Sequence, residues 1–331
     1  MKTRFNISES KKFAIFIRSA YGDLIMTIPL IKVIKAINPN CFIKIFAESK
    51  NSEIIPFIPH VDEYEIIPSK GNKYLSFIKY GFKNRAAKFD YCFSAKTGTG
   101  SANGFFPFCL GAKNRVSYVP LKLRWTDYLI NRKILFNEKM HYESQHYALG
   151  VLGLLIERPT MSHLHNFKPT LNIKSKLGGS YKILTSVSNN RSSCQLKNST
   201  LAKILNSLAE KYKFEIIVSY IEKDKELALD LKKRLRPKVS LKSTPKIKQL
   251  LELISSVNLL FIGEGGIMHM AAAMEKPQLV LFGITSEVTW GPLSNSSTVI
   301  KDEKDVNSIP SDVIVSKLVK IVGKSLKHKH G

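Results

Sequence analysis

The sequence predicts an α/β protein made of two doubly wound domains that face each other across a cleft. Its 331 residues suffice for two domains of ordinary size. Short apolar runs, typical of buried parallel strands, alternate with amphipathic stretches along both halves. A polar segment over Thr160–Ser180, which contains Pro169 and Gly178-Gly179, separates the halves and is interpreted as the interdomain connection. We therefore expect domains over residues 1–165 and 166–331.

The first half opens with a strand at Phe13–Ile17, an apolar run of the length that buried parallel strands have. The loop Arg18–Asp23 leads into a predicted helix over Leu24–Ile37, which ends before Pro39. A second helix is predicted over Tyr142–Ile156. Three more apolar segments predict further strands of the same sheet: Cys41–Phe46, Tyr64–Ile67 and Tyr91–Ala95.

The second half repeats the alternation, which favours a second sheet of parallel strands joined by helices. Apolar runs predict its strands at Tyr181–Val187, Phe214–Ser219, Asn258–Ile262 and Gln278–Phe282. Helical periodicity predicts its helices at Thr200–Tyr212, Lys223–Arg234, Ile247–Ser255, Ile267–Met274 and Asp312–Ser325.

Composition excludes several classes of protein. Hydrophobic residues make up 44% and charged residues 23%, which argues against disorder. The four cysteines lie far apart without a CxxC pair, which argues against a disulfide framework or a structural zinc site and fits a reducing cytoplasm. The longest stretch without a charge, Thr97–Ala112, contains Pro107 and is too short to span a membrane. The first dozen residues lack the apolar core of a signal peptide, so we expect a soluble protein that is not exported.

The chain is strongly basic. Fifty-one Lys and Arg against 26 Asp and Glu give a net charge of +25, and the halves carry +12 and +13. Such an excess favours an anionic partner, either nucleic acid, an acidic membrane surface or phosphorylated substrates, although a lysine-rich composition without a specific partner is the alternative. Aromatic residues interleave with a run of basic ones: Lys79, Lys83, Arg85, Lys88, Lys96, Lys113, Arg115, Lys122, Arg124, Arg132 and Lys133.

The loop Ser19-Ala-Tyr-Gly-Asp23 follows the first strand, where open α/β sheets bind their ligands. Gly22 allows a tight turn, and Asp23 lies at the start of a helix. Two interpretations stay open on position alone: Asp23 caps the helix, or its carboxylate is a general base.

The stretch Gly263-Glu-Gly-Gly-Ile-Met-His269 follows a later strand and opens a helix of small residues. The free N–H groups and dipole of such a helix favour an anion such as a diphosphate, to which His269 can also donate. Turn glycines and a buried core histidine are the structural alternative. A polar loop in Leu281-Phe-Gly-Ile-Thr-Ser286 is expected beside this stretch, at the same edge of the sheet.

Taken together and in this order, these segments resemble glycosyltransferase family 9, the ADP-heptose:lipopolysaccharide heptosyltransferases. The family's first loop, R-x-S-S-x-G-D, reads Arg18-Ser-Ala-Tyr-Gly-Asp23, with Pro29 in the following helix. Its D-T-G-x-x-H-x-A-A-A motif reads Glu264–Ala273, followed by Lys276-Pro277 and a strand that ends Phe282-Gly-Ile-Thr285. Gly111-Ala-Lys-Asn-Arg115 is similar to its G-A-x-x-R segment.

The resemblance implies a GT-B architecture of two Rossmann-like domains, with the acceptor bound to the first and the nucleotide-sugar to the second. Asp23 takes the role of the family's catalytic base. The expected acceptor-binding residues are Ser19, Lys96 and Arg115. The expected donor-binding residues are Arg191, Lys197, Glu222, Glu264, Gly265, Gly266, Ile267 and His269.

The activity that the resemblance implies is inverting, metal-independent transfer of a heptose from ADP-heptose to a phosphorylated lipopolysaccharide core acceptor, with no cofactor. We expect a cytoplasmic enzyme, peripheral on the anionic inner face of the inner membrane, and no nucleic-acid partner. Three departures bear on the donor: Glu264-Gly265 replaces Asp-Thr, Ala20 replaces the second serine, and only Arg191 or Lys197 is available for the family's phosphate-contacting lysine. A transferase of another nucleotide-sugar, a sugar-nucleotide 2-epimerase and a non-catalytic binder of anionic glycolipid stay open as alternatives.

Overall fold

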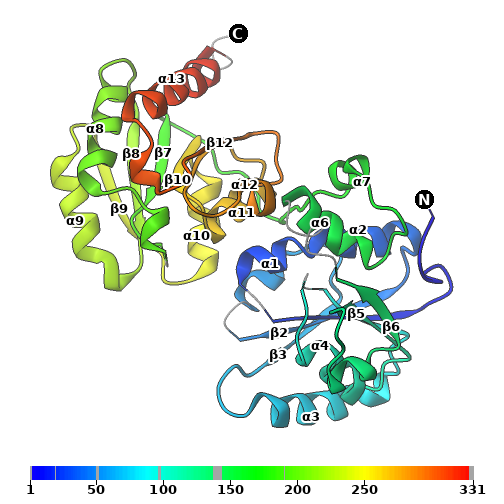
Figure 1. The fold of residues 1–331 in the computed structure, drawn as a ribbon. Helices are drawn as coiled ribbons and strands as arrows, with labels where there is room; N and C mark the ends of the chain where they lie inside the picture. The colour runs from blue at the N-terminus through cyan, green and yellow to red at the C-terminus, as the bar shows by residue number, and fades with distance from the viewer. Residues whose placement is uncertain are drawn as a thin grey trace. The chain divides into compact units, whose positions relative to one another are not determined.

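The computed structural model describes residues 2–18, 20–49, 52–95, 98–136, 144–189 and 191–327 (Figure 1). The chain forms two compact units, Met1–Asn172 and Ile173–Gly331. The division lies inside the expected connection Thr160–Ser180, but the first part of that segment is a helix, α7 (Met161–Asn166). Thr160 caps this helix by accepting a hydrogen bond from the His163 N–H, a local signal that the interpretation as a connection did not use.

The first unit is built on a six-stranded sheet in the order β3-β2-β1-β4-β5-β6, and each neighbouring pair is parallel. Its strands are β1 (Lys12–Ile17), β2 (Phe42–Glu48), β3 (Glu63–Ile67), β4 (Tyr91–Ser94), β5 (Asn114–Val119) and β6 (Arg132–Leu135). Its other helices are α1 (Tyr21–Ile25), α2 (Ile28–Ile37), α3 (Lys73–Asn84), α4 (Ala102–Cys109) and α6 (Ser144–Gly153), with short 3-10 turns η1 (Ser52–Phe57), η2 (Arg85–Ala87) and η3 (Trp125–Leu129).

The helix predicted over Leu24–Ile37 is two helices, so that prediction was wrong. The first, α1, begins three residues earlier at Tyr21, and α2 begins at Ile28. Pro29 lies in the first turn of α2 and has no N–H to donate to the carbonyl of Ile25. The backbone bonds of one continuous helix are therefore interrupted, and the chain leaves β1 through a short helix of its own.

Aromatic side chains form the core between the sheet and the helices α3 and α4. Phe16 of β1 stacks on Phe106 of α4, with ring centroids 4.4 Å apart, and meets Phe77 of α3 edge-on at 5.5 Å. These three rings lie in one buried cluster with Phe46 and Phe89. Helices α3 and α4 therefore cover the same face of the sheet.

The second unit repeats this topology with the strand order β12-β11-β10-β7-β8-β9, again parallel throughout. Its strands are β7 (Lys182–Ser186), β8 (Glu215–Tyr220), β9 (Val239–Ser243), β10 (Leu259–Gly263), β11 (Gln278–Phe282) and β12 (Ser297–Lys301). Its helices are α8 (Asn198–Ala209), α9 (Lys225–Arg234), α10 (Ile247–Ser255), α11 (Gly266–Ala273), α12 (Glu287–Trp290) and α13 (Ser311–Lys327), with η4 (Ser192–Cys194), η5 (Glu222–Asp224) and η6 (Val306–Ser308).

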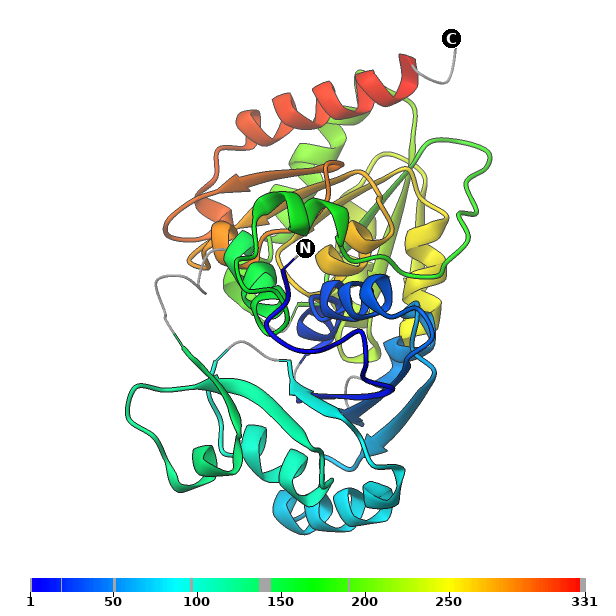
Figure 2. The ribbon, with the colours of Figure 1, turned by 90° about the vertical axis from the view of Figure 1, so that its right-hand side faces the viewer.

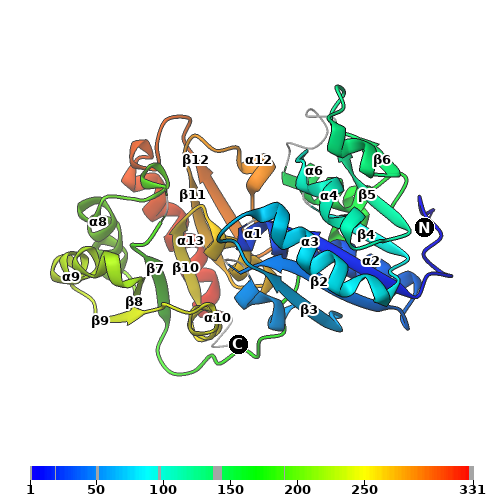
Figure 3. The ribbon, with the colours of Figure 1, turned by 90° about the horizontal axis from the view of Figure 1, so that it is seen from below.

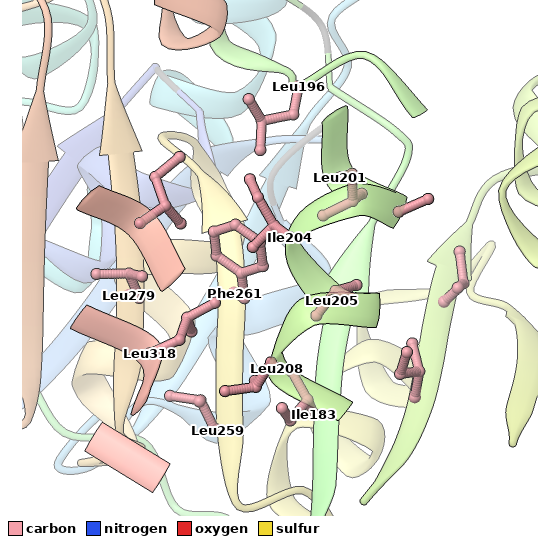
Figure 4. Close-up of a cluster of buried hydrophobic side chains, with 14 of the residues drawn as sticks. Ile183, Leu196, Leu201, Ile204, Leu205, Leu208, Leu259, Phe261, Leu279 and Leu318 are labelled. Carbon is pink, nitrogen blue, oxygen red and sulfur yellow. The ribbon is translucent and has the colours of Figure 1, made fainter. Parts of the chain in front are cut away.

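The core of the second unit lies between its sheet and the helices α8, α9 and α13. Alternate residues of the central strands, such as Ile183, Phe261 and Leu279, pack against Leu205 and Leu318 (Figure 4). Helix α13 lies beside α8 on this face (Figure 2).

Both sheets have the strand order of a doubly wound fold, and two such units confirm the predicted fold class. In each sheet the two strands that follow the first one lie on one side of it, and the last three strands lie on its other side. The two switch points lie between β1 and β4 and between β7 and β10. Ligands of this fold class bind at the carboxyl ends of the strands beside the switch point.

No helix in the described ranges is both long and apolar enough to cross a lipid bilayer.

Candidate active site

In the first unit the switch point presents Asp23. The chain leaves the carboxyl end of β1 at Ile17, and Asp23 follows on the third residue of α1. Ala20 holds the N-cap position, and no side chain caps the helix. Asp23 is therefore not the cap of this helix, and the structural alternative left open for it was wrong. Its backbone carbonyl accepts a hydrogen bond from the hydroxyl of Thr27, 2.9 Å away.

The Asp23 carboxylate is held by a tyrosine from a distant part of the chain. Tyr147 of α6 donates from Oη to Asp23 Oδ1 over 2.5 Å. Tyr147 is 2% exposed, so the ring is fixed by its packing and its hydroxyl is aimed at the carboxylate. A bond to one oxygen orients the carboxylate and leaves the second oxygen, Oδ2, as the atom that can take a proton. No sequence pattern pointed to Tyr147, because 124 residues separate the two side chains.

Arg18, the first residue of the loop motif, is also fixed at this end of the sheet. Its Nε lies 2.5 Å from Glu48 Oε1, at the end of the neighbouring strand β2, and its guanidinium lies 5.3 Å from the ring centre of Phe77. The loop after β1 thus begins with a cation, Arg18, and leads to a carboxylate, Asp23.

Of the three predicted acceptor-binding residues, the structure describes only Arg115. Ser19 and Lys96 lie outside the described residues. Arg115 is the second residue of β5 and pairs with Cys92, which pairs with Ala14. It therefore lies level with the first half of β1, away from the carboxyl edge that carries Asp23. Its guanidinium donates to the carbonyls of residues 129 and 112, over 2.6 and 3.0 Å.

Arg115 therefore links β5 to the neighbouring loops through its hydrogen bonds, and it does not lie beside Asp23. The motif Gly111–Arg115 marks the start of a strand, whereas the ligand edge lies at the strand's end. An acceptor contact at Arg115 stays a prediction.

In the second unit, the loops that follow β7 and β10 meet at the switch point. Gly263 ends β10, and a Cβ at this position would lie 1.7 Å from the carbonyl oxygen of Cys194 in the loop after β7. Only glycine allows the two loops to approach this closely. The next residue, Glu264, is tied to the first loop by a bond from Asn189 Nδ2 to its carbonyl, over 2.9 Å.

Glu264 organises the polar groups of this edge. Its side chain is 4% exposed, and its Oε1 lies 3.0 Å from Arg191 Nη1 and 2.9 Å from the sulfur of Cys194. The same Arg191 nitrogen donates to Thr285 Oγ1 over 3.1 Å. Three loops therefore converge on one guanidinium, which is 62% exposed and so stays available to a ligand. The Thr285 contact confirms that the polar loop after β11 lies beside the glycine stretch.

Cys194 is a structural partner of this cluster. Burial first, and then its hydrogen bond to Glu264 and the charge of that carboxylate, raise the pKa of the Cys194 thiol to about 11. The protonated thiol is the donor that Glu264 accepts. Neither Cys194 nor Asn189 could be predicted as part of the site, because an isolated cysteine or asparagine in a polar loop carries no spacing signal.

The glycine stretch opens helix α11 at Gly266, with Gly265 at the N-cap position. Gly265, Gly266 and Ile267 thus supply the first N–H groups of a helix of eight residues, next to the Arg191–Glu264 pair. His269 lies in the first turn of this helix and is 8% exposed.

Two predicted donor residues lie farther along the neighbouring loops. Lys197 holds the N-cap position of α8 and lines a groove with Ser193, Asn198 and Asp230. Glu222 follows β8, is 73% exposed and lies 3.6 Å from the amino group of Lys225. Of the two cations left open for the phosphate contact, Arg191 is the one that joins the glycine stretch.

Across the described ranges, His, Cys, Asp and Glu side chains form no group of three or more that could hold a metal ion.

Residues 197–315 match the family model of glycosyltransferase family 9 (heptosyltransferase). No curated protein sequence gave a significant match. Three solved structures share the fold: ADP-heptose lps heptosyltransferase II of E. coli (17% identity, TM-score 0.77, 96% of this chain and 99% of that one), the family 9 glycosyl transferase of Veillonella parvula DSM 2008 (14%, 0.79, 98% and 100%) and E. coli heptosyltransferase WaaC with ADP (13%, 0.70, 93% and 99%).

The family model therefore confirms, over residues 197–315, the resemblance to glycosyltransferase family 9 that the motifs indicate, and the solved structures confirm the two-unit fold over nearly the whole chain.

Proposed function

We propose that this protein is an inverting heptosyltransferase that moves a heptose from ADP-heptose to a phosphorylated lipopolysaccharide core acceptor. The observation that carries the proposal is the Asp23 carboxylate, held by the buried Tyr147 hydroxyl at the switch point of the first sheet. Support comes from the family model and from two similar folds whose names include ADP-heptose or ADP.

Asp23 acts as the general base. Its free oxygen takes the proton of the acceptor hydroxyl as that oxygen forms a bond to the anomeric carbon of the heptose. The bond from that carbon to the diphosphate breaks on the opposite face, which inverts the anomeric configuration, and ADP leaves with the electron pair. A positioned base of this kind contributes about 10²–10⁴-fold to the rate.

The second unit binds the donor and stabilises the leaving group. Negative charge grows on the diphosphate as the bond breaks, and the N–H groups at the start of α11 are suited to donate hydrogen bonds to its oxygens. Arg191 adds a full positive charge beside them. Because Glu264 holds one guanidinium nitrogen, Arg191 is pre-oriented, and the guanidinium stays exposed enough to donate to a ligand. The proposal includes no metal and no cofactor.

Thermal stability in the presence of nucleotides tests the donor. We expect ADP and ADP-heptose to raise the unfolding temperature, whereas UDP, GDP and CMP leave it unchanged. Selective stabilisation by UDP or GDP would keep a transferase but discard heptose as the transferred sugar. If no nucleotide shifts the transition, the donor site is refuted.

Replacement of the base tests the chemistry separately. We expect Asp23→Asn to lower turnover by about 10²–10⁴-fold and to leave the affinity for ADP within twofold of the wild type. Full turnover in this variant would exclude Asp23 as the base.

A further inference from the structure

Exposed apolar side chains gather on one side of the first unit. The helices α3 and α4 and the loop of residues 120–129, which includes η3, are here called the α3–η3 face. Of seventeen large hydrophobic side chains that stay exposed in the described residues, eight belong to it: Leu75, Ile78, Phe82, Phe108, Leu121, Leu123, Trp125 and Tyr128. Leu121, Tyr128 and Trp125 are 83%, 69% and 67% exposed.

The three elements are neighbours in space. Helix α3 packs against α4 (Figure 3), and α4 packs against η3. The ring centroids of Phe105 and Trp125 lie 6.3 Å apart, and a Cβ at Gly104 of α4 would lie 2.1 Å from the backbone carbonyl oxygen of Thr126. On α3 the exposed apolar residues Leu75, Ile78 and Phe82 follow the i, i+3, i+7 spacing of one helical stripe. The apolar side chains therefore form one surface.

The segments that build this surface are also strongly basic. Residues 73–88 and 102–135, which include the strands β5 and β6 as well, hold eleven Lys and Arg and one acidic residue, a net charge of +10. The single acid, Asp127, is buried and paired with Arg124 over 3.0 Å. Cations lie over the exposed rings: Arg85 is 5.2 Å from the ring centre of Phe82, and Lys133 is 6.0 Å from that of Tyr128.

We propose that the α3–η3 face is the surface by which this protein binds an anionic lipid bilayer. Lysines and arginines attract the negative headgroups, while leucine, phenylalanine and tryptophan side chains enter the boundary between headgroups and acyl chains. The exposed leucines and isoleucine decide against nucleic acid, because aliphatic side chains neither stack on bases nor bind phosphates. The proposal shares with the proposed function only the lipid nature of the acceptor.

Sedimentation with vesicles tests the surface. We expect the protein to bind vesicles that contain phosphatidylglycerol and to leave pure phosphatidylcholine vesicles unbound at 0.15 M salt. Each lysine removed should weaken binding about fivefold, so Lys79→Gln, Lys122→Gln and Lys133→Gln together should weaken it about 100-fold. The control triple Lys203→Gln, Lys232→Gln and Lys248→Gln removes the same charge from exposed positions of the second unit and should change binding less than threefold. Equal losses in the two triples would overturn the proposal.

Insertion is tested by fluorescence, since the chain has two tryptophans. In a Trp290→Phe background, the emission of Trp125 should shift to the blue with phosphatidylglycerol vesicles and be quenched by brominated acyl chains. Phe82→Ser with Leu121→Ser should lower vesicle binding at least tenfold without altering the thermal transition, because both side chains are more than half exposed. Unchanged Trp125 emission on bound vesicles, or tighter binding to single-stranded RNA than to vesicles, would refute the proposal.

A water-soluble acceptor without acyl chains separates this inference from the proposed function. The surface variants should transfer sugar to it at the wild-type rate. If neither the variants nor the wild type transfer sugar, the proposed function fails while the vesicle measurements still decide on the surface.

Discussion

Replacement of Tyr147 by phenylalanine removes the hydroxyl that holds Asp23 and keeps the ring that fills the core. The side chain is 2% exposed, so the ring packing should survive the change. The Asp23 carboxylate then loses the donor that lies 2.5 Å from its Oδ1 and gains rotational freedom. We expect turnover to fall, because the carboxylate of the base is no longer held in the orientation that faces the acceptor hydroxyl.

The size of the loss follows from the bond. A hydrogen bond to a charged group contributes about 1.5–3 kcal/mol, which corresponds to a loss of about 10- to 150-fold in kcat if the bond acts wholly on the transition state. The affinity for ADP should stay within twofold, because Tyr147 and the donor residues belong to different units.

Initial rates of ADP release give the assay, and a second buried tyrosine gives the control. Tyr118 is fully buried and donates its hydroxyl to the carbonyl of Gly150, in the same helix α6. Tyr118→Phe should lower the unfolding temperature as Tyr147→Phe does, since each removes one buried hydrogen bond. It should leave kcat unchanged, because its bond does not reach Asp23.

A double-mutant cycle decides whether Tyr147 acts through Asp23. In an Asp23→Ala background, Tyr147→Phe should change kcat less than twofold, since the carboxylate that it orients is gone. If the second substitution costs the same factor in both backgrounds, Tyr147 acts independently of Asp23 and the positioning role is refuted.

Three further predictions concern the second unit. Arg191→Ala should weaken ADP binding by about 10- to 100-fold in calorimetry, because it removes the cation beside α11 and leaves the buried Glu264 without its counter-ion. Arg191→Lys should recover part of this loss. Unchanged affinity in Arg191→Ala would contradict the assignment of Arg191 to the donor site. Gly263→Ala should lower the free energy of unfolding by about 1–3 kcal/mol or more, because the new Cβ meets the Cys194 carbonyl, while Gly178→Ala, which meets nothing within 4 Å, serves as the control in a thermal scan. Cys194 should resist iodoacetamide at pH 8 in the folded protein, since its raised pKa of about 11 keeps it a thiol, and rapid alkylation in peptide mass spectrometry would show the cluster to be open.

The central strands could be predicted from sequence because they are buried on both faces. The runs at Phe13–Ile17 and Gln278–Phe282 are continuous and apolar, and both became strands at the expected positions. The edge strands β6, β9 and β12 are partly exposed, carry no such run and were missed. Exposure is not the whole reason, because the exposed edge strand β3 was predicted at Tyr64–Ile67 and the inner strand β5, with four buried residues, was missed. The helices α3 and α4 escaped prediction for a related reason: α3 turns apolar side chains to both the core and the surface, and α4 contains Gly104 and Pro107.

The candidate site was predictable where its residues share a strand end and unpredictable where they meet through packing. Asp23, Glu264 and Thr285 each follow a central strand, and their positions in the sequence are enough to place them at ligand edges. Tyr147 comes from α6, a helix that packs against α2, and its distance in sequence from Asp23 hides the contact. The position of Arg115 was also beyond prediction, since a motif carried over by resemblance gave no information on which end of the strand it would occupy.

The measurement that tests the central claim most directly is sugar transfer itself. Purified protein is incubated with ADP-heptose and a heptose-free lipopolysaccharide core acceptor, and the molecular mass of the acceptor is then measured by mass spectrometry. We predict the gain of one heptose residue, release of one ADP per transfer, and an anomeric configuration opposite to that of the donor in NMR spectra. ADP-heptose that is recovered intact beside an unmodified acceptor, under conditions in which ADP binds the protein, would contradict the account.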